Sequence, residues 1–222
     1  MIYAYGICEP AIGAPTLRRG GLGGAALRAL EREGLAAVYS RHRSLQPRPV
    51  PKSVLDHERV VEAIMARGAV LPLRFGTQLA DEEELGAVLA ERRDELLRSL
   101  ERVRGKVELG LRIIPSPRAE ENPAPEVTGR GYLMGRVRAH RRDRQAVREV
   151  HPALASLSEA TCIRRPQGGR ATFVGAYLVE SHRVAEFRLK AEDLAQRQAG
   201  LQLIVTGPWP PYSFVTEEQR CG

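Results

Sequence analysis

Strands are indicated at several points by the pattern of apolar and polar positions along the chain. Residues 107–113 alternate between aliphatic and other side chains, which is typical of a strand with one buried face. Residues 2–8 form an apolar, partly aromatic run and predict a first strand. Residues 26–31 and 35–40 flank Glu33–Gly34 and predict a hairpin, although the residue types of the first of these segments also favour a helix.

Two helices are predicted in the first half by apolar positions that recur every three or four residues. The first begins with Ser53 as its N-cap and ends at Gly68. The second begins with Asp81 as its N-cap, has Glu84 in place for a capping box and ends at Gly105. Its apolar stripe consists of Leu85, Leu89, Leu96, Leu100 and Val103.

The segment between these two helices, residues 69–75, is apolar and rich in residues that favour strands. Pro72 inside it cannot donate a backbone hydrogen bond, so we expect either an edge strand or a local bulge. Arg74 is a charge within this apolar run. Either it points outward from the strand, or it is buried beside a carboxylate such as Glu58 or Glu62.

The second half is separated from the first by the best linker candidate in the chain, the proline-rich residues 115–127. We therefore expect an N-terminal domain over residues 1–114 and a C-terminal domain over residues 128–222. The elements expected in the second half are a helix over residues 131–158, strands over residues 161–164 and 171–180, a helix from Ser181 to Gly200 and a strand over residues 201–205.

This mixture of strands and helices, without strict alternation, predicts an α+β fold in both domains, each with a mixed or antiparallel sheet and packed helices. The second half has the order helix, strand, strand, helix, strand. One further strand at its start, supplied by residues 107–113 or by residues near the linker, would complete the βαββαβ order of a ferredoxin-like domain.

Composition and charge narrow the class of protein. The chain has 222 residues and a net charge of +7, and only three of its 34 basic residues are lysines. Arginine binds phosphate well, but a GC-rich codon supply also favours arginine, and the basic excess is spread over both halves. No apolar run is long enough to span a membrane, and the N-terminus lacks the pattern of a signal peptide. Three scattered cysteines without a CxxC pair indicate a cytoplasmic protein.

Candidate catalytic and ligand-binding groups are few. Gly21, Gly23 and Ala26 partly match a dinucleotide fingerprint, but no strand leads directly into them, so we interpret this stretch as a plain loop. His57 lies on the apolar face of its helix and is interpreted as a core histidine, while a catalytic pair with Cys8 has no local signature. The histidines lack metal-ligand spacing. The sequence therefore predicts neither an enzyme nor a cofactor or metal site.

Arginines are concentrated in residues 130–148, a stretch that contains seven of them, including Arg138 and Arg142. On a helix these side chains would surround most of the circumference and would not form one basic face. This pattern favours a solvated helix or one that contacts an acidic partner. Nucleic-acid binding through the same arginines is the alternative function.

The only tryptophan, Trp209, lies in a C-terminal segment with three prolines, residues 206–214. The prolines exclude a helix and favour an extended course. The segment either folds back over its own domain and buries Trp209 and Phe214, or presents an aromatic side chain to a partner. Both interpretations can hold together.

Five segments, in their order along the chain, resemble one family, that of the gas vesicle proteins F and L. Two of them are long and unusual, VLPLRFGT at residues 70–77 and TGPWPPYSF at residues 206–214. The others are YAYGI at residues 3–7, GLAAV at residues 34–38 and HE-x-VV at residues 57–61. The resemblance covers nearly the whole chain but leaves out the glycine-rich loop and the arginine-rich stretch.

This resemblance implies a two-domain α+β protein with a ferredoxin-like second domain and a non-enzymatic role in gas vesicle formation. Such a protein would be a cytoplasmic accessory or minor shell component that binds the hydrophobic major shell protein, and other accessory proteins, during nucleation and assembly. An open sheet edge or an exposed apolar face could shield such a client from self-association. The residues expected to contact partners are Leu71, Leu73, Phe75, Trp209, Tyr212, Phe214, Arg138 and Arg142.

Overall fold

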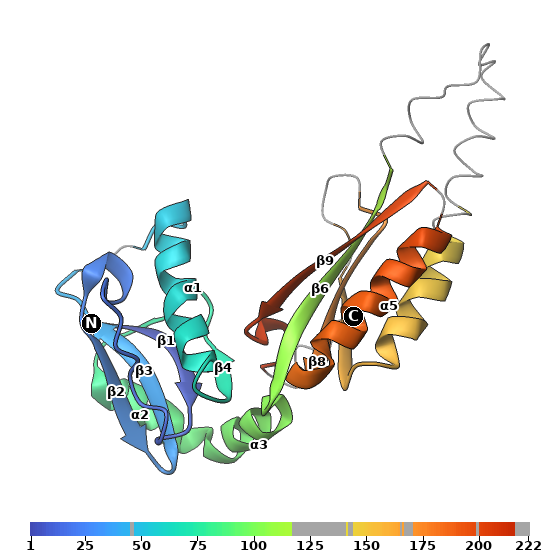
Figure 1. The fold of residues 1–222 in the computed structure, drawn as a ribbon. Helices are drawn as coiled ribbons and strands as arrows, with labels where there is room; N and C mark the ends of the chain where they lie inside the picture. The colour runs from blue at the N-terminus through green and yellow to red at the C-terminus, as the bar shows by residue number, and fades with distance from the viewer. Residues whose placement is uncertain are drawn as a thin grey trace. The chain divides into compact units, whose positions relative to one another are not determined.

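Two compact units make up the computed structural model (Figure 1). The first combines Met1–Val107 with the tail that starts at Trp209, and the second lies within Glu108–Pro208. We expected the tail to belong to the C-terminal domain, but its aromatic residues pack within the first unit. The described residues are 1–44, 47–116, 141, 144–164, 166, 171–198 and 200–215.

A five-stranded antiparallel sheet forms the centre of the first unit. Its strand order is β2-β3-β1-β4, and β5 also pairs with β1. All residues of β1 are buried, which fits the apolar run that predicted this strand. The strands are β1 Ile2–Cys8, β2 Leu27–Arg32, β3 Leu35–Arg41, β4 Val70–Pro72 and β5 Gln78–Leu79.

The predicted hairpin is confirmed as β2 and β3. Arg32 pairs with Leu35, so Glu33 and Gly34 form a two-residue turn. Their φ angles are 52° and 80°. Positive φ at both central positions is characteristic of a type I′ turn, whose twist matches that of the flanking strands. The competing helix is therefore wrong.

Three helices accompany this sheet, and α1 lies beside β1 and β4 (Figure 1). The N-cap of α1 is Val50, so the predicted cap, Ser53, instead lies inside the first turn. Pro51 is a good first residue because the N–H groups of a first turn have no partner within the helix. The helices are α1 Pro51–Met65, α2 Glu82–Glu91 and α3 Arg93–Val103.

The second predicted helix is divided into α2 and α3. The break lies at Arg92, where φ is −104° and ψ is 16°. It falls in the widest gap of the apolar stripe, between Leu89 and Leu96. Residues 90–94 are exposed there, so no packing holds a continuous helix together.

Asp81 caps α2 as predicted. Its Oδ1 accepts hydrogen bonds from the N–H groups of Glu83 and Glu84, each at 3.0 Å. The Glu84 carboxylate accepts from the N–H of Ala80, one residue before the cap, so the expected reciprocal bond to Asp81 is shifted by one position.

The core of the first unit lies between β1, β3 and α1. A bulge at Tyr5 interrupts the pairing of β1 with β3, because the register passes from Ala4–Tyr39 to Gly6–Val38. The buried core residues are Tyr3, Tyr5, Cys8, Ile12, Leu22, Ala36, Val38, Val60, Val61, Ile64 and Val70.

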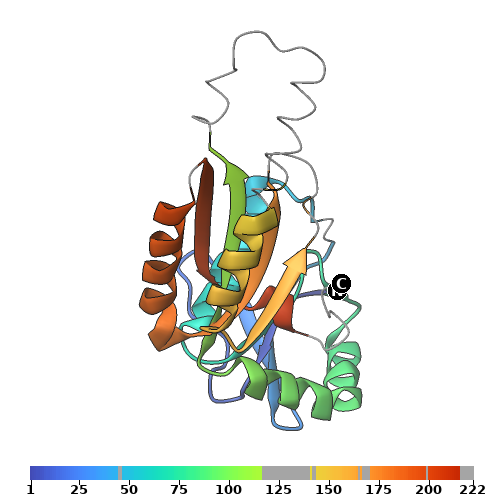
Figure 2. The same ribbon diagram turned by 90° about the vertical axis from the view of Figure 1, so that its right-hand side faces the viewer.

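The second unit is a four-stranded sheet in the order β7-β8-β6-β9 with two helices packed on it (Figure 2). The alternating segment at residues 107–113 is confirmed as the middle of β6, and its burial alternates as predicted. The elements are β6 Lys106–Pro115, a helix over residues 144–155, β7 Ala160–Arg164, β8 Phe173–Glu180, α5 Val184–Arg197 and β9 Leu201–Trp209.

Along the described residues of this unit the elements follow the order βαββαβ, because β6 supplies the strand that the sequence left open. The ferredoxin-like assignment itself stays a prediction. The α+β class, with two sheets and packed helices, is confirmed.

Three details of the second unit differ from expectation. Ser181 does not cap α5 but begins a 3₁₀ turn, η3 Ser181–Arg183. β9 continues past its expected end at Val205 as far as Trp209. Residues 156–158 are not helical. The predicted linker beyond Ser116, and residues 131–140 of the predicted helix, lie outside the described residues.

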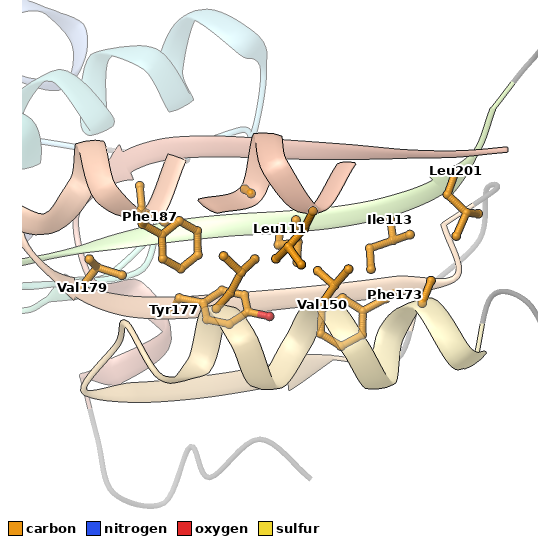
Figure 3. Close-up of a cluster of buried hydrophobic side chains, with 13 residues drawn as sticks. Leu111, Ile113, Val150, Phe173, Tyr177, Val179, Phe187 and Leu201 are labelled. Atoms are coloured by element: carbon orange, nitrogen blue, oxygen red, sulfur yellow. The ribbon is translucent and has the colours of Figure 1, made fainter. Parts of the chain in front are cut away.

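The core of the second unit lies between the sheet and its two helices (Figure 3). Phe187 of α5 meets Tyr177 of β8 edge to face, with ring centroids 5.2 Å apart. The Tyr177 hydroxyl lies 2.9 Å from Nδ1 of His151. The buried residues of this core are Leu109, Leu111, Ile113, Ala146, Val150, Leu154, Phe173, Tyr177, Val179, Phe187, Ala191, Leu194 and Leu201.

Candidate functional site

A buried histidine fastens α1 to the segment that follows β4. His57 Nε2 lies 3.0 Å from the carbonyl oxygen of Leu73, and its Nδ1 lies 2.9 Å from Tyr3 Oη. Because a carbonyl oxygen can only accept, Nε2 carries the proton and Nδ1 accepts from the Tyr3 hydroxyl. Tyr3 Oη in turn accepts from the N–H of Gly76 at 3.1 Å. Both ring nitrogens of His57 and the Tyr3 hydroxyl therefore have hydrogen-bond partners.

Burial decides the protonation of this cluster. Burial lowers the pKa of His57 to about 4, so the imidazole is neutral at neutral pH, as its hydrogen bonds require. Burial also raises the pKa of Tyr3 to about 12. The Tyr5 ring stacks on the imidazole with centroids 5.6 Å apart. The interpretation of His57 as a core histidine is confirmed, and both of its ring nitrogens have a hydrogen-bond partner.

A second buried tyrosine holds the glycine-rich loop. Tyr5 Oη accepts from the N–H of Leu22 at 2.7 Å and lies 2.8 Å from Ser40 Oγ. A Cβ on Gly21 would come within 2.2 Å of Tyr5 Oη, so only glycine allows this approach. The loop contains the short η1 Leu22–Gly24 and leads into β2. It therefore lacks the helix that a dinucleotide site needs.

The motif at residues 70–77 is fastened to β1 by backbone hydrogen bonds. The N–H of Leu73 donates to the carbonyl of Tyr5 at 2.9 Å, and the N–H of Ala4 donates to the carbonyl of Thr77 at 3.0 Å. Arg74 is exposed and is not buried beside a carboxylate, but it does not lie in a strand, because β4 ends at Pro72 and is shorter than the predicted residues 69–75.

β4 is an edge strand of its sheet, as expected, but it offers no open edge to a partner. All of its residues are buried, and α3 packs against it. The N–H of Leu73 points toward β1, and successive backbone nitrogens of a strand point in opposite directions. The nitrogen of Pro72 therefore points away from β1, so the missing N–H of proline costs no hydrogen bond in the sheet. Leu71 is fully buried and belongs to the core, which corrects its choice as a surface contact. Leu73 and Phe75 are half-buried.

The tail is anchored to α1 and α3 within the first unit. Tyr212 Oη donates to Glu58 Oε1 at 2.9 Å, and the Arg102 guanidinium donates to the carbonyl of Phe214. Burial is the main cause that raises the pKa of both Tyr212 and Glu58. Phe214 is buried within the 3₁₀ turn η4 Tyr212–Phe214, whereas Trp209 remains 44% exposed. The interpretation that the tail folds back therefore holds for Phe214, although it packs within the first unit, and is wrong for Trp209.

Cys8 and His57 do not form a catalytic pair. Cys8 is buried in the core, its thiol is free, and burial raises its pKa to about 12. Both His57 nitrogens already bond to Tyr3 and Leu73. Within the described ranges, no three His, Cys, Asp or Glu side chains gather where they could hold a metal ion. No helix in this part of the chain combines the length and apolarity of a membrane span.

The arginine-rich stretch is described only in part, and Arg138 and Arg142 lie outside the described residues. Arg144 and Arg148 are exposed on the helix over residues 144–155. The opposite face of that helix places Ala146, Val150 and Leu154 in the core.

The sequence analysis did not predict that Glu58 and Arg102 anchor the tail, although Glu58 belongs to the HE-x-VV segment and was considered as a partner of Arg74. Both are charged residues on helices, and no local pattern relates either of them to the tail. The one sequence signal was the tail motif itself, since a tyrosine hydroxyl that is removed from water needs a hydrogen-bond partner, and the half-buried Tyr212 has one in Glu58.

Comparisons with protein families and with known proteins point to the same family. A family model described as gas vesicle synthesis protein GvpL/GvpF matches residues 1–216. Gas vesicle protein L of Streptomyces sp. (strain CB03234) is 34% identical over a region that covers 71% of this chain and 66% of that protein. Gas vesicle protein F of the same strain is 32% identical over a region that covers 96% of this chain and 98% of that protein.

Two solved structures share the fold over nearly the full length. The crystal structure of GvpF from Anabaena sp. PCC7120 has a TM-score of 0.80 at 17% identity and covers 97% of this chain and 95% of its own. GvpF from Microcystis aeruginosa has a TM-score of 0.78 at 18% identity, with 97% and 98% covered.

Proposed function

Since this chain belongs to the GvpL/GvpF family of gas vesicle synthesis proteins, we propose that it binds the hydrophobic major shell protein and supports its nucleation and assembly. In this proposal it acts in the cytoplasm as a non-catalytic accessory or minor shell component, together with other gas vesicle proteins. The two alternatives that the sequence raised, an enzyme built on Cys8 and His57 and a nucleic-acid binder, gain no support from the described residues.

The exposure of Trp209 is the observation that carries this proposal. Trp209 is the only tryptophan and remains 44% exposed, although the residues that follow it are held in place. Tyr212 and Phe214 anchor the tail to Glu58 and Arg102. A tryptophan on a backbone segment that is already held in place loses less entropy on binding than one on a free segment, and tryptophan is typical of interface hot spots.

The other residues predicted to contact partners differ in how deeply they are buried. Leu73 and Phe75 are half-buried and could contribute at the rim of a surface for an apolar client. Tyr212 and Phe214 position the tail, and we assign them no direct contact. Leu71 is buried and cannot contact a partner. Contacts through Arg138 and Arg142 remain predictions.

Co-purification with the co-expressed major shell protein tests this proposal. We expect the tagged full-length chain to capture the shell protein, and Trp209→Ala to lower the amount captured by about tenfold or more, because truncation of a tryptophan hot spot costs at least about 2 kcal/mol. The measurement is the ratio of shell protein to tagged chain after elution.

Leu189→Ala is the matched control, because Leu189 is 67% exposed and lies in the second unit. Its capture ratio should equal that of the unaltered chain. Phe214→Ala is unsuitable because Phe214 is buried and its loss would release the tail. Absence of shell protein from the eluate of the unaltered chain, under conditions where other accessory proteins are captured, would contradict the proposal.

A further inference from the structure

The first unit has a hollow that the proposed function does not use. It is an open depression of about 640 Å³ between the glycine-rich loop and the first turns of α1. Its volume is in the range of pockets that hold small ligands, roughly 300–1,000 Å³. The residues that line it are Arg19, Gly23, Gly24, Lys52, Leu55, Asp56 and Arg59.

One stripe of α1 forms a wall of this hollow. Lys52, Leu55, Asp56 and Arg59 are spaced by three and four residues, so they share one face of the helix. His57 and its buried neighbours point to the core, about a third of a turn away. The hollow is thus separate from the buried network.

The hollow is positively charged. It contains three cations and a single carboxylate, that of Asp56. Lys52 Nζ and Arg59 Nη1 donate to the two Asp56 oxygens at 2.9 and 3.0 Å. The hydrogen bond from Lys52 is the main cause that lowers the pKa of Asp56, so this carboxylate is ionised. Asp56 therefore positions two cations whose remaining N–H groups stay available.

Arg19 supplies the third charge from the opposite wall. Among the described residues its guanidinium has neither an ion pair nor a side-chain hydrogen bond. Gly23 and Gly24 beside it have positive φ values of 63° and 80° and carry no side chain that would fill the space. A Cβ on Gly23 would meet nothing within 4 Å. The loop thus leaves room for an anionic group in front of Arg19.

An exposed leucine gives this charged hollow an apolar component. Leu55 is 61% exposed, although it lies between charged neighbours on the helix. A phosphate backbone offers nothing apolar for such a side chain to contact. A peptide that combines carboxylates with one apolar side chain matches both properties at once, because its charges can pair with Arg19 and Arg59 while its apolar group covers Leu55.

We propose that this hollow docks a partner segment of acidic residues that contains one apolar anchor. The site goes beyond the proposed function, since it uses none of the residues assigned to the shell protein. Arg19, Lys52 and Arg59 bind the carboxylates, and Leu55 contacts the apolar side chain. Asp56 holds Lys52 and Arg59 in position.

Fluorescence anisotropy with short labelled peptides tests the proposal on the full-length protein. Each peptide carries one leucine and several glutamates at varied spacing, and a second set carries lysines in place of the glutamates. We expect at least one acidic peptide to bind with a micromolar dissociation constant and the lysine set not to bind. Arg19→Glu and Leu55→Glu should each weaken binding by about tenfold or more.

Two matched variants make the test specific. Arg18→Glu changes the same charge at an exposed neighbour that does not line the hollow, and Leu189→Glu changes an equally exposed leucine elsewhere. Both should bind like the unaltered chain. All four positions are exposed, so the variants should fold, which circular dichroism checks.

Three outcomes would overturn the proposal. The first is absence of binding by every acidic peptide. The second is an equal loss in Arg18→Glu and Arg19→Glu, which would indicate only a general effect of net charge. The third is tighter binding of a single-stranded DNA oligonucleotide of similar length than of any acidic peptide, which would indicate a phosphate site.

Discussion

Acidification from about pH 7 to about pH 4.5 is expected to lower the unfolding free energy of the first unit by about 2–3 kcal/mol through His57 alone. Burial lowers the pKa of His57 from 6.5 to about 4. Between these values the unfolded chain binds a proton at His57 and the folded chain does not. Acid therefore favours unfolding in this window, and the contribution is constant above about pH 6.5.

Urea denaturation followed by the fluorescence of Trp209, the only tryptophan, measures this effect, with far-ultraviolet circular dichroism in parallel because Trp209 both starts the tail of the first unit and ends β9. His57→Gln is the matched variant, because an amide can also donate to the Leu73 carbonyl and accept from the Tyr3 hydroxyl. Its stability should depend less steeply on pH in this window. Equal slopes for the two proteins would show that His57 is not buried in its neutral form.

Phe187→Ala is expected to lower the unfolding free energy by about 3–5 kcal/mol, the largest effect of any substitution considered for the second unit. Phe187 is fully buried between α5 and the sheet and contacts Tyr177 edge to face (Figure 3). Its removal loses apolar burial and leaves a cavity, because residues on both the sheet and the helices surround the ring. Urea denaturation followed by far-ultraviolet circular dichroism measures the loss.

Leu189→Ala provides the control on the same helix. Leu189 lies two positions further along α5 but is 67% exposed, so its truncation should change stability by no more than about 0.5 kcal/mol. A similar loss in both variants would mean that the face of α5 that packs on the sheet has been assigned incorrectly.

Elements set by local sequence were predicted well, whereas those that depend on distant packing were not. The hairpin at Glu33–Gly34 follows from turn chemistry between two strands, and the alternation along β6 follows from burial of one face. The break at Arg92 was missed because helix-favouring residues continue through it. Only the absence of packing on residues 90–94 distinguishes the break from a continuous helix.

The candidate site shows the same division. The apolar face of α1 identified His57 as a core residue, but its partners come from β1 and from the segment after β4, which no spacing relates to it. The motif with Trp209 was noticed because of its composition. Its position on the first unit depends on Glu58 and Arg102, which lie far from it in the sequence.

Vesicle formation in the host of this gene tests the central claim most directly. The number of gas vesicles per cell would be counted by electron microscopy with the gene intact, deleted and restored, while the amount of major shell protein is followed in parallel. We predict that deletion abolishes or sharply lowers vesicle number although shell protein is still made, and that restoration recovers it. An unchanged number of vesicles in the deletion strain would contradict a role in assembly.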